Sequence, residues 1–383
     1  MPKTSFRSSA RRSQTRTTTE APAMDASAFP RALPLSDFPR LVQSVQRNCH
    51  IADARHAREM TLCNYLLEMR EFYRWEHEVP LARALPRQEL GSWISEREAL
   101  WDALQADDMA PLRVGEQSFD AFEVDAINAA LVPQGLVYGG GYGRFGKPHF
   151  FLAQLERHEQ RQGLRLFVSG CEYARDLSAP PAALQGGTVF LRRDALRRWL
   201  WDKIEVWGVR KADGALKSAL ECYGFLTDAE TALEHMAEKE AETLILHELG
   251  EAMAEPLLGA AWRDLIASFT RRRAEMLARA VRDNLADCLS TLPRLIERDT
   301  ACSIHFYFAN FEGVRASLFP SLDRGYRSWR ESGNLDALRA AARTGAAHWH
   351  GVGLRLLRVH QATPAAAEET IAAWFEDPAE LAL

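Results

Sequence analysis

The stretch from Asp228 to Glu255, DAETALEHMAEKEAETLILHELGEAMAE, sets the character of the second half of this chain. It contains nine acidic residues and a single lysine, so an imidazole within it lies in a strongly negative field. Residues three and four apart share one face of a helix, so Glu240, His247 and Glu251 point the same way on a helix from 228 to 254. Such a helix can offer metal ligands, because its field holds a proton or attracts a cation.

The string from His247 to Glu251, HELGE, is one residue short of the zinc-protease pattern, which has a second histidine where this chain has Glu251. The opposite face of this helix carries an apolar stripe of Ile245, Leu249, Met253 and Leu257, so the polar face is free to be solvated. Leu244, Ala254 and Leu258 interrupt the polar face. That interruption favours partial cover by protein and keeps a functional site open as an interpretation.

The next helix, predicted from 259 to 294, has a core stripe of Leu277, Val281, Leu285 and Cys288. Arg279, Asp283 and Asp287 therefore lie together on its other side, where the two carboxylates could complete a site with His247. Alternatively, Arg279 and Asp283 form an ordinary helix ion pair worth a few tenths of a kcal/mol. The acidic run can also pair with the arginines of this helix, at positions 263, 271, 272, 273, 279 and 282.

The connection through Pro256 and Gly259 is so short that the two helices are predicted to pack antiparallel. Equal rise along both helices then places Glu251 near 263–271, His247 level with 271–275, and Asp283 opposite 232–240. Asp283 reaches His247 only if the second helix starts late or kinks. Otherwise the remaining ligands come from elsewhere, and we expect a site between domains in which His247 and Glu251 face the turn from Cys49 to His56.

The whole chain is predicted to be a mainly helical α+β protein, because 383 residues exceed what one hydrophobic core usually organises. We expect a disordered tail at 1–33, an α+β domain at 34–226 and an all-α domain at 227–383. A small antiparallel β meander is expected at 135–168, joined by a short strand at 188–191. The tail has the composition of a transit peptide, although a late start at Met24 explains it equally well and is the simpler interpretation. The helices are expected at 36–75, 88–104, 119–131, 193–206, 228–254, 259–294, 302–317, 322–329, 334–357 and 365–375.

The overall charge argues against a nucleic-acid partner, because 47 basic and 52 acidic residues give a formal charge of -5. No stretch approaches the roughly 20 apolar residues of a membrane span, and no secretory signal follows the N-terminus. The six cysteines show no Cys-x-x-Cys pair and no disulfide-framework density. We therefore expect free thiols in a cytoplasmic protein.

The first helix carries a thiol, a carboxylate and an imidazole on one face, because Cys49, Asp53 and His56 are spaced i, i+4 and i+7. Such groups can bind zinc or iron, with His50 as a further ligand and Arg55 as a candidate catalytic residue. The structural alternative is favoured. In it, Cys49 and Cys63 are core thiols, and His56 is a core histidine hydrogen-bonded to Asp53.

The glycine-rich segment GGGYGRFGKPH, residues 139–149, could wrap a phosphate. The cations for such a site are Arg144, Lys147 and His149, and a neighbouring loop adds Glu172 and Arg175. The segment is not a P-loop, since a proline follows the lysine. A glycine-rich hairpin connection is the favoured interpretation.

The chain resembles a bacterial family of two-domain proteins with no assigned function. The resemblance rests on four strings in this order: NCHIADA at 48–54, CEYARDLSAPP at 171–181, HELGEA at 247–252 and LAD at 285–287. The resemblance covers about residues 40 to 350 and implies architecture rather than activity. The family pattern has threonine after Leu-Ala-Asp, where this chain has Cys288, so that position is given no role.

The leading hypothesis is a metal-dependent enzyme that acts on a small molecule, with non-haem iron or zinc bound by His247, Glu251 and either Asp283 or Asp287. Glu248 would orient a ligand or act as general acid or base. One alternative is a non-catalytic binding or scaffold protein in which acidic and arginine-rich helices neutralise each other. Another is a binder of a phosphorylated ligand at the glycine-rich hairpin.

Overall fold

The computed structural model describes residues 37–383, apart from the side chains of Arg144, Arg210 and Ala365. The first part of the chain forms helices and a small antiparallel hairpin. These elements are α1 (Asp37–His56), η2 (Ala57–Glu59), α2 (Leu62–Glu76), α3 (Arg87–Leu104), β1 (Leu112–Val114), β2 (Gln117–Phe119), α4 (Val124–Leu131) and η3 (Val132–Gln134). The predicted tail at 1–33 lies outside the described residues.

The helix expected at 36–75 is broken in two, because the chain leaves the helical conformation at Met60 and Thr61. The Thr61 side chain accepts a hydrogen bond from the Asn64 amide and so caps the start of α2. The break also changes the phase of the apolar stripe. Cys49 is buried as expected, whereas Cys63 is exposed and is not a core thiol.

Five strands form one mixed sheet in the order β3-β4-β5-β7-β6. They are β3 (Leu136–Tyr142), β4 (Pro148–Arg161), β5 (Leu164–Arg175), β6 (Ala182–Gln185) and β7 (Thr188–Arg192), with η4 (Arg144–Gly146) between β3 and β4. The first three strands are an antiparallel meander, but the chain then crosses over and β7 runs parallel to β5. The expected small meander is therefore only part of a larger sheet, whose edge strand β6 pairs with β7 through a tight Gly186-Gly187 turn.

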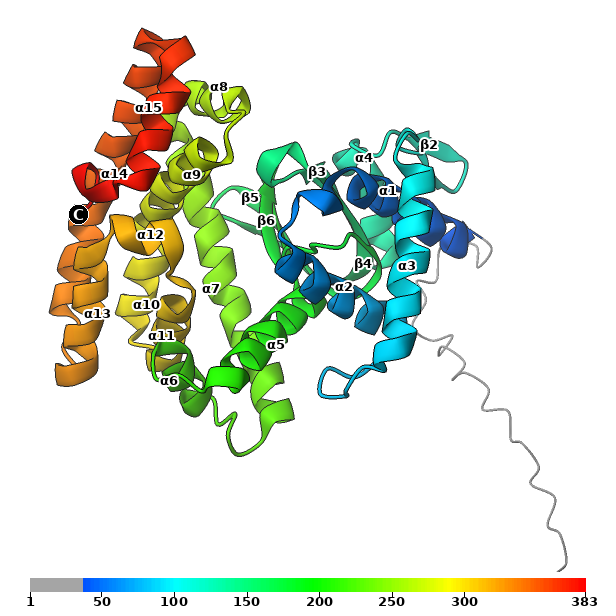
Figure 1. Ribbon diagram of the computed structural model, residues 1–383, viewed down its shortest axis with the longest axis horizontal. Helices are drawn as coiled ribbons and strands as arrows, with labels where there is room; N and C mark the ends of the chain where they lie inside the picture. The colour runs from blue at the N-terminus through cyan, green and yellow to red at the C-terminus, as the bar shows by residue number, and fades with distance from the viewer. Residues whose placement is uncertain (1–36) are drawn as a thin grey trace, which may run out of the picture.

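The rest of the chain is helical, as predicted. Its elements are α5 (Arg193–Arg210), α6 (Ala215–Cys222), α7 (Ala229–Leu258), α8 (Ala260–Ser268), α9 (Arg272–Ala286), the π-helix η5 (Asp287–Thr291), α10 (Leu292–Arg298), α11 (Ala301–Asn310), α12 (Gly313–Leu318), α13 (Pro320–Ser332), α14 (Asp336–Ala362), α15 (Pro364–Glu376) and η6 (Pro378–Glu380). Figure 1 shows α7 between the sheet on one side and the outer helices on the other. On the sheet side α7 contacts β6 and β7, and on the other side it contacts α9.

The single helix expected at 259–294 is four consecutive elements, α8, α9, η5 and α10. Pro256 does not end α7, since it lies in the last turn and Gly259, with φ of 76°, ends the helix instead. The predicted core stripe of α9 is confirmed, because Leu277, Val281 and Leu285 are all fully buried. The stripe of α7 is only half right: Ile245 and Leu249 are buried, whereas Met253 and Leu257 are 39% and 42% exposed.

The expectation of free thiols is wrong for two cysteines. Cys222, at the end of α6, forms a disulfide with Cys302 at the start of α11. The spacing of 80 residues between them gave no motif that could predict the pair. Among the described residues, no helix is both long enough and apolar enough to cross a membrane.

Candidate functional site

The α7–α9 crossing brings two backbones unusually close together at Gly250. A Cβ atom at this position would lie 2.2 Å from the carbonyl oxygen of Ala286, the last residue of α9. Only glycine therefore fits this contact without movement of the backbone. The helix widens into a π-helix immediately after Ala286, and this single wide turn presents Asp287 to α7.

His247 and Asp287 form the centre of the cluster at this crossing. The Nδ1 atom of His247 lies 2.7 Å from Asp287 Oδ1, and its Nε2 atom lies 3.5 Å from Glu251 Oε1. Asp287 also accepts hydrogen bonds from Thr291 Oγ1 and Tyr307 Oη, each at 2.9 Å. Its fourth partner is the Arg315 guanidinium. Asp287 is thus fixed by four groups, and it in turn fixes the orientation of the imidazole ring.

Asp283 completes a compact set of donor atoms with His247 and Glu251. Each of the three offers a ligand atom within 4.8 Å of the other two. The Arg282 guanidinium lies among them, paired with Glu251 and donating to Asp283 Oδ1 at 3.0 Å. This arrangement can bind a cation, and the cationic side chain of Arg282 already lies against it.

Burial and charge shift the protonation equilibria of this cluster. Burial alone would lower the pKa of His247, but Asp287 and Glu251 raise it well above its ordinary value. Burial raises the pKa of Asp287, and Arg315 and His247 outweigh this effect, so the net pKa is lowered. Burial, reinforced by the Glu251 charge, raises the pKa of Glu248 to about 8. Glu248 therefore keeps a proton near neutral pH beside charged neighbours.

The predicted register of this helix pair is wrong, although the antiparallel direction is correct. Glu251 lies beside Arg282 rather than 263–271, and His247 lies beside Asp287 rather than 271–275. The reason is that the chain turns at 269–271 and α9 begins late, at Arg272. This late start is the condition under which Asp283 reaches His247.

The other charged residues of these helices pair differently from the prediction. Arg279 pairs with Glu275 at 2.7 Å, not with Asp283. Of the six arginines expected to neutralise α7, only Arg263 and Arg282 form ion pairs with it among the described residues. Glu240 is buried and bonds to Tyr223, Thr243 and Ser303, so it lies outside the cluster.

The candidates on α1 belong to separate contacts in the N-terminal part of the chain. Cys49 is buried and donates to the Phe150 carbonyl oxygen at 3.2 Å. Burial and Arg97 lower the pKa of His50 to about 3, and both ring nitrogens of His50 are occupied, Nε2 by Arg97 at 2.8 Å and Nδ1 by Trp101 at 3.3 Å. We expected His247 and Glu251 to face this turn. Among the described residues, no hydrogen bond or ion pair joins either side chain to it.

Asp53 and Arg55 likewise have structural partners. Asp53 accepts from Lys147 Nζ and from the Leu177 amide, each at 2.8 Å, rather than from His56. Arg55 is exposed and donates to the backbone carbonyl groups of Gln105 and Asp107, just after α3. The structure therefore gives Arg55 a helix-capping contact.

The ligand-binding candidates of the hairpin come together in a buried charge network. Lys147 and His149 both approach Asp176, with His149 Nδ1 at 2.6 Å from its Oδ2. Glu172 accepts from Arg192 at 2.5 Å and lies 4.0 Å from Arg175. Because Asp53, Glu172 and Asp176 balance the cations, this network has little spare positive charge for a phosphate. The side chain of Arg144 lies outside what the structure describes.

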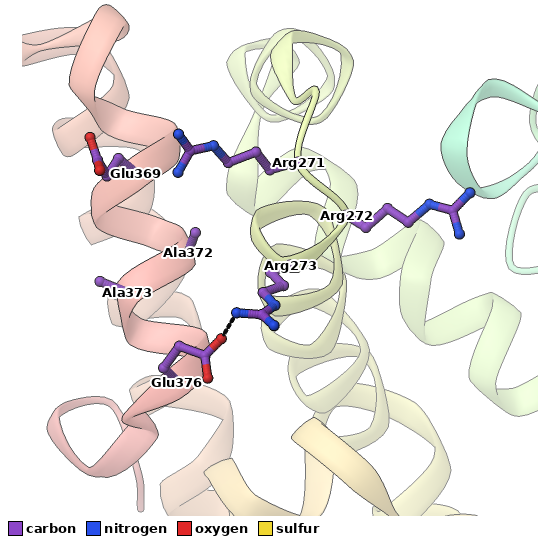
Figure 2. A pocket seen from close by; sticks show the side chains of 7 residues that line it. All are labelled: Arg271, Arg272, Arg273, Glu369, Ala372, Ala373 and Glu376. Carbon is purple, nitrogen blue, oxygen red and sulfur yellow. Dashed lines mark hydrogen bonds and ion pairs between the residues drawn. The ribbon is translucent and has the colours of Figure 1, made fainter. Parts of the chain in front are cut away.

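An open cavity of about 520 Å³ lies elsewhere, between the start of α9 and α15 (Figure 2). Its lining consists of Arg271, Arg272, Arg273, Glu369, Ala372, Ala373 and Glu376. Figure 2 shows the Arg273 and Glu376 side chains paired across it, while Arg272 points away from α15. The cavity holds none of the residues of the His247 cluster.

Sequence reasoning missed the roles of four residues of this cluster. The sequence marks Arg282 only as a partner for the acidic run, and it does not mark Thr291, Tyr307 or Arg315. The contacts of Tyr307 and Arg315 depend on how α11 and α12 pack near η5, and no spacing in the sequence reports that packing. Asp176 and Arg192 of the hairpin network were also missed. Asp176 lies within the string at 171–181, and Arg192 directly follows the strand expected at 188–191.

The fold and this cluster define a mainly helical two-domain protein with a histidine, carboxylate and arginine centre between helices. Two family models match it: the N-terminal domain of a family of unknown function (DUF6866) matches residues 40–192, and the C-terminal domain of the same family matches residues 197–378. The chain belongs to this family. No curated protein and no solved structure matches it. The matched ranges meet at the start of α5, whereas the helical pattern predicts a boundary at 226.

Proposed function

We propose that this protein is a metal-dependent enzyme whose His247, Glu251 and Asp283 bind a zinc or iron(II) ion. The observation that carries the proposal is the compact donor set, with three ligand atoms within 4.8 Å of one another. One imidazole and two carboxylates suit either metal. In addition, the hydrogen bond from Nδ1 to Asp287 leaves Nε2 of His247 directed at the carboxylates, as is usual for a metal-binding histidine.

The residues around the ion have separable roles. Zinc or iron(II) would supply Lewis-acid chemistry to a substrate oxygen. Asp287, fixed by Tyr307 and Arg315, orients the imidazole and increases its basicity. Glu248 holds a proton at neutral pH and is the candidate general acid. Arg282 provides the positive charge beside Glu251 and Asp283 in the absence of an ion.

Metal content tests this proposal. Protein purified without an affinity tag and reconstituted with zinc or iron(II) should bind about one equivalent of metal, and His247→Ala should bind less than about 0.1 equivalents. Glu242→Gln is a matched control, because Glu242 is also an ion-paired glutamate on α7 but bonds to Arg161. A wild-type protein that binds less than about 0.1 equivalents after reconstitution would leave the cluster as a closed ion-pair network.

The closed network is the non-catalytic alternative, and the pairing of Arg282 with Glu251 and Asp283 is the observation that favours it. It predicts that His247→Ala and Glu251→Ala lower stability without removing any bound metal. Phosphate binding at the hairpin has less support, since each cation of that network already has an acidic neighbour.

A further inference from the structure

A second group of carboxylates lies between α2 and α5, apart from the His247 cluster. Glu71 comes from α2, and Asp202 and Glu205 come from one turn of α5. Each offers an oxygen atom within 4.8 Å of the other two. Two helices that are distant in the sequence therefore direct three acids at one point.

The described cations do not satisfy this group. Arg74 donates to Glu71 Oε1 at 3.0 Å and also lies 3.8 Å from Glu205 Oε1, and Arg70 donates to Glu205 at 2.8 Å. The Asp202 side chain forms no hydrogen bond or ion pair with any residue that the structure describes. Glu71 is only 2% exposed, and its Oε2 atom is buried without a hydrogen-bond partner. A buried carboxylate oxygen without a donor is costly, so this atom indicates a missing positive partner.

Neighbouring charges lead to the same conclusion. Three carboxyl groups, from Glu71, Asp202 and Glu205, face two arginines, Arg70 and Arg74. A further arginine whose charge acts on Glu71, Arg198, is paired with Asp194 at 3.5 Å. The group therefore carries more negative than positive charge.

We propose that Glu71, Asp202 and Glu205 form a binding site for a hard divalent cation of the calcium class. All the ligand atoms are carboxylate oxygens, which calcium prefers, and no sulfur or imidazole takes part. The Glu205 side chain is 30% exposed and leaves an entry path, while the buried Glu71 forms the floor. A bound ion ties α2 to α5, and this site is independent of the proposed enzyme function.

Calcium titration of the chelator-treated full chain tests the site. Isothermal titration calorimetry should show one calcium equivalent in the wild type and in His247→Ala, because His247 is not a ligand here. Asp202→Asn and Glu205→Gln should weaken the affinity by about tenfold or more. Both acids are partly exposed, so these variants avoid the buried Glu71. Glu156→Gln is the matched control, with a side chain 33% exposed and paired with Arg193.

Two outcomes would overturn the proposal. One is a wild-type chain that gives neither binding heat nor a rise in melting temperature with calcium, magnesium or manganese at about 10 mM, above the weakest usual protein affinities. In that case Arg198 supplies the missing charge by turning toward Glu71. The other is an Asp202→Asn variant that binds calcium as tightly as Glu156→Gln, which would place the ion elsewhere.

Discussion

At the scale of single residues, Gly250 decides how closely α7 approaches α9. Its added Cβ would meet the Ala286 carbonyl oxygen at 2.2 Å and the carbonyl carbon at 2.7 Å, and a backbone cannot move aside as a flexible side chain can. Gly250→Ala should therefore lower the free energy of unfolding by about 1–3 kcal/mol, the usual cost of overpacking. Urea denaturation measures this change.

Gly351 provides the control, because it also lies within a helix, α14, and an added Cβ there has nothing within 4 Å. Gly351→Ala should raise stability by up to about 1 kcal/mol, since alanine has the higher helix propensity. Equal behaviour of the two variants would show that the backbones do not approach closely at Gly250.

His50 makes the fold sensitive to acid. Its folded pKa is about 3, lowered by burial and by Arg97, whereas an unfolded histidine titrates near 6.5. Between these values the unfolded chain binds the extra proton, so stability is lost as the pH falls from about 6.5 towards 3. At pH 5 the loss should approach about 2 kcal/mol, from 1.36 kcal/mol per unit of pKa.

The His50→Gln variant isolates this effect, because glutamine does not titrate. The fall in melting temperature between pH 7 and pH 5 should be smaller in the variant than in the wild type. An identical fall in both proteins would mean that His50 does not remain neutral in the folded state.

Part of the candidate site is visible in the sequence at this scale. His247 and Glu251 are one turn apart, so their shared face follows from helix geometry alone. The contacts of Asp287 with Tyr307 and Arg315 depend instead on packing between helices. Spacing along the chain does not encode that packing, and so these partners were not predicted.

At the scale of elements, the Cys222–Cys302 disulfide joins the end of α6 to the start of α11. The neighbouring Tyr223 and Ser303 both bond to the buried Glu240 of α7, so the cross-link lies where α6 and α11 meet α7. The pair is 80 residues apart, and the chain-entropy model gives a stabilisation of about 4.5 kcal/mol for such a loop.

Replacing both cysteines with serine should accordingly lower the melting temperature by several degrees, as should reduction of the wild type. The effect of reductant should be absent in the double variant. A wild-type melting temperature that does not respond to reductant, with the thiols shown to be free, would contradict a stabilising role.

The sequence predicts which segments are helices or strands, but not where consecutive elements begin and end or how they connect. Apolar periodicity located every long helix of the second half, because periodicity reports which face is buried. The breaks at 269–271 and at Met60 lack a proline or glycine signal and were missed. The crossover that sets β7 parallel to β5 was also missed, since strand order depends on contacts remote in sequence.

At the scale of the whole molecule, the glycine-rich hairpin meets the C-terminal helices directly. The Phe145 amide donates to Glu275 at 3.2 Å, Arg272 stacks on the Phe145 ring, and Arg272 pairs with Glu59 at 3.1 Å. Arg272 and Glu59 are each about half exposed. Arg272→Ala should therefore lower the free energy of unfolding by less than about 1 kcal/mol, as measured by urea denaturation. A much larger loss would show that this contact is a main source of stability between the two halves of the molecule.

The proposed metal ion at the α7–α9 crossing can be located by anomalous diffraction from crystals grown with zinc. We expect one strong peak within about 2.0–2.3 Å of His247 Nε2 and of carboxylate oxygens from Glu251 and Asp283, with the Arg282 guanidinium displaced. A map with no peak at this position, and with Arg282 still paired to both carboxylates, would show that the crossing is an ion-pair network without a metal.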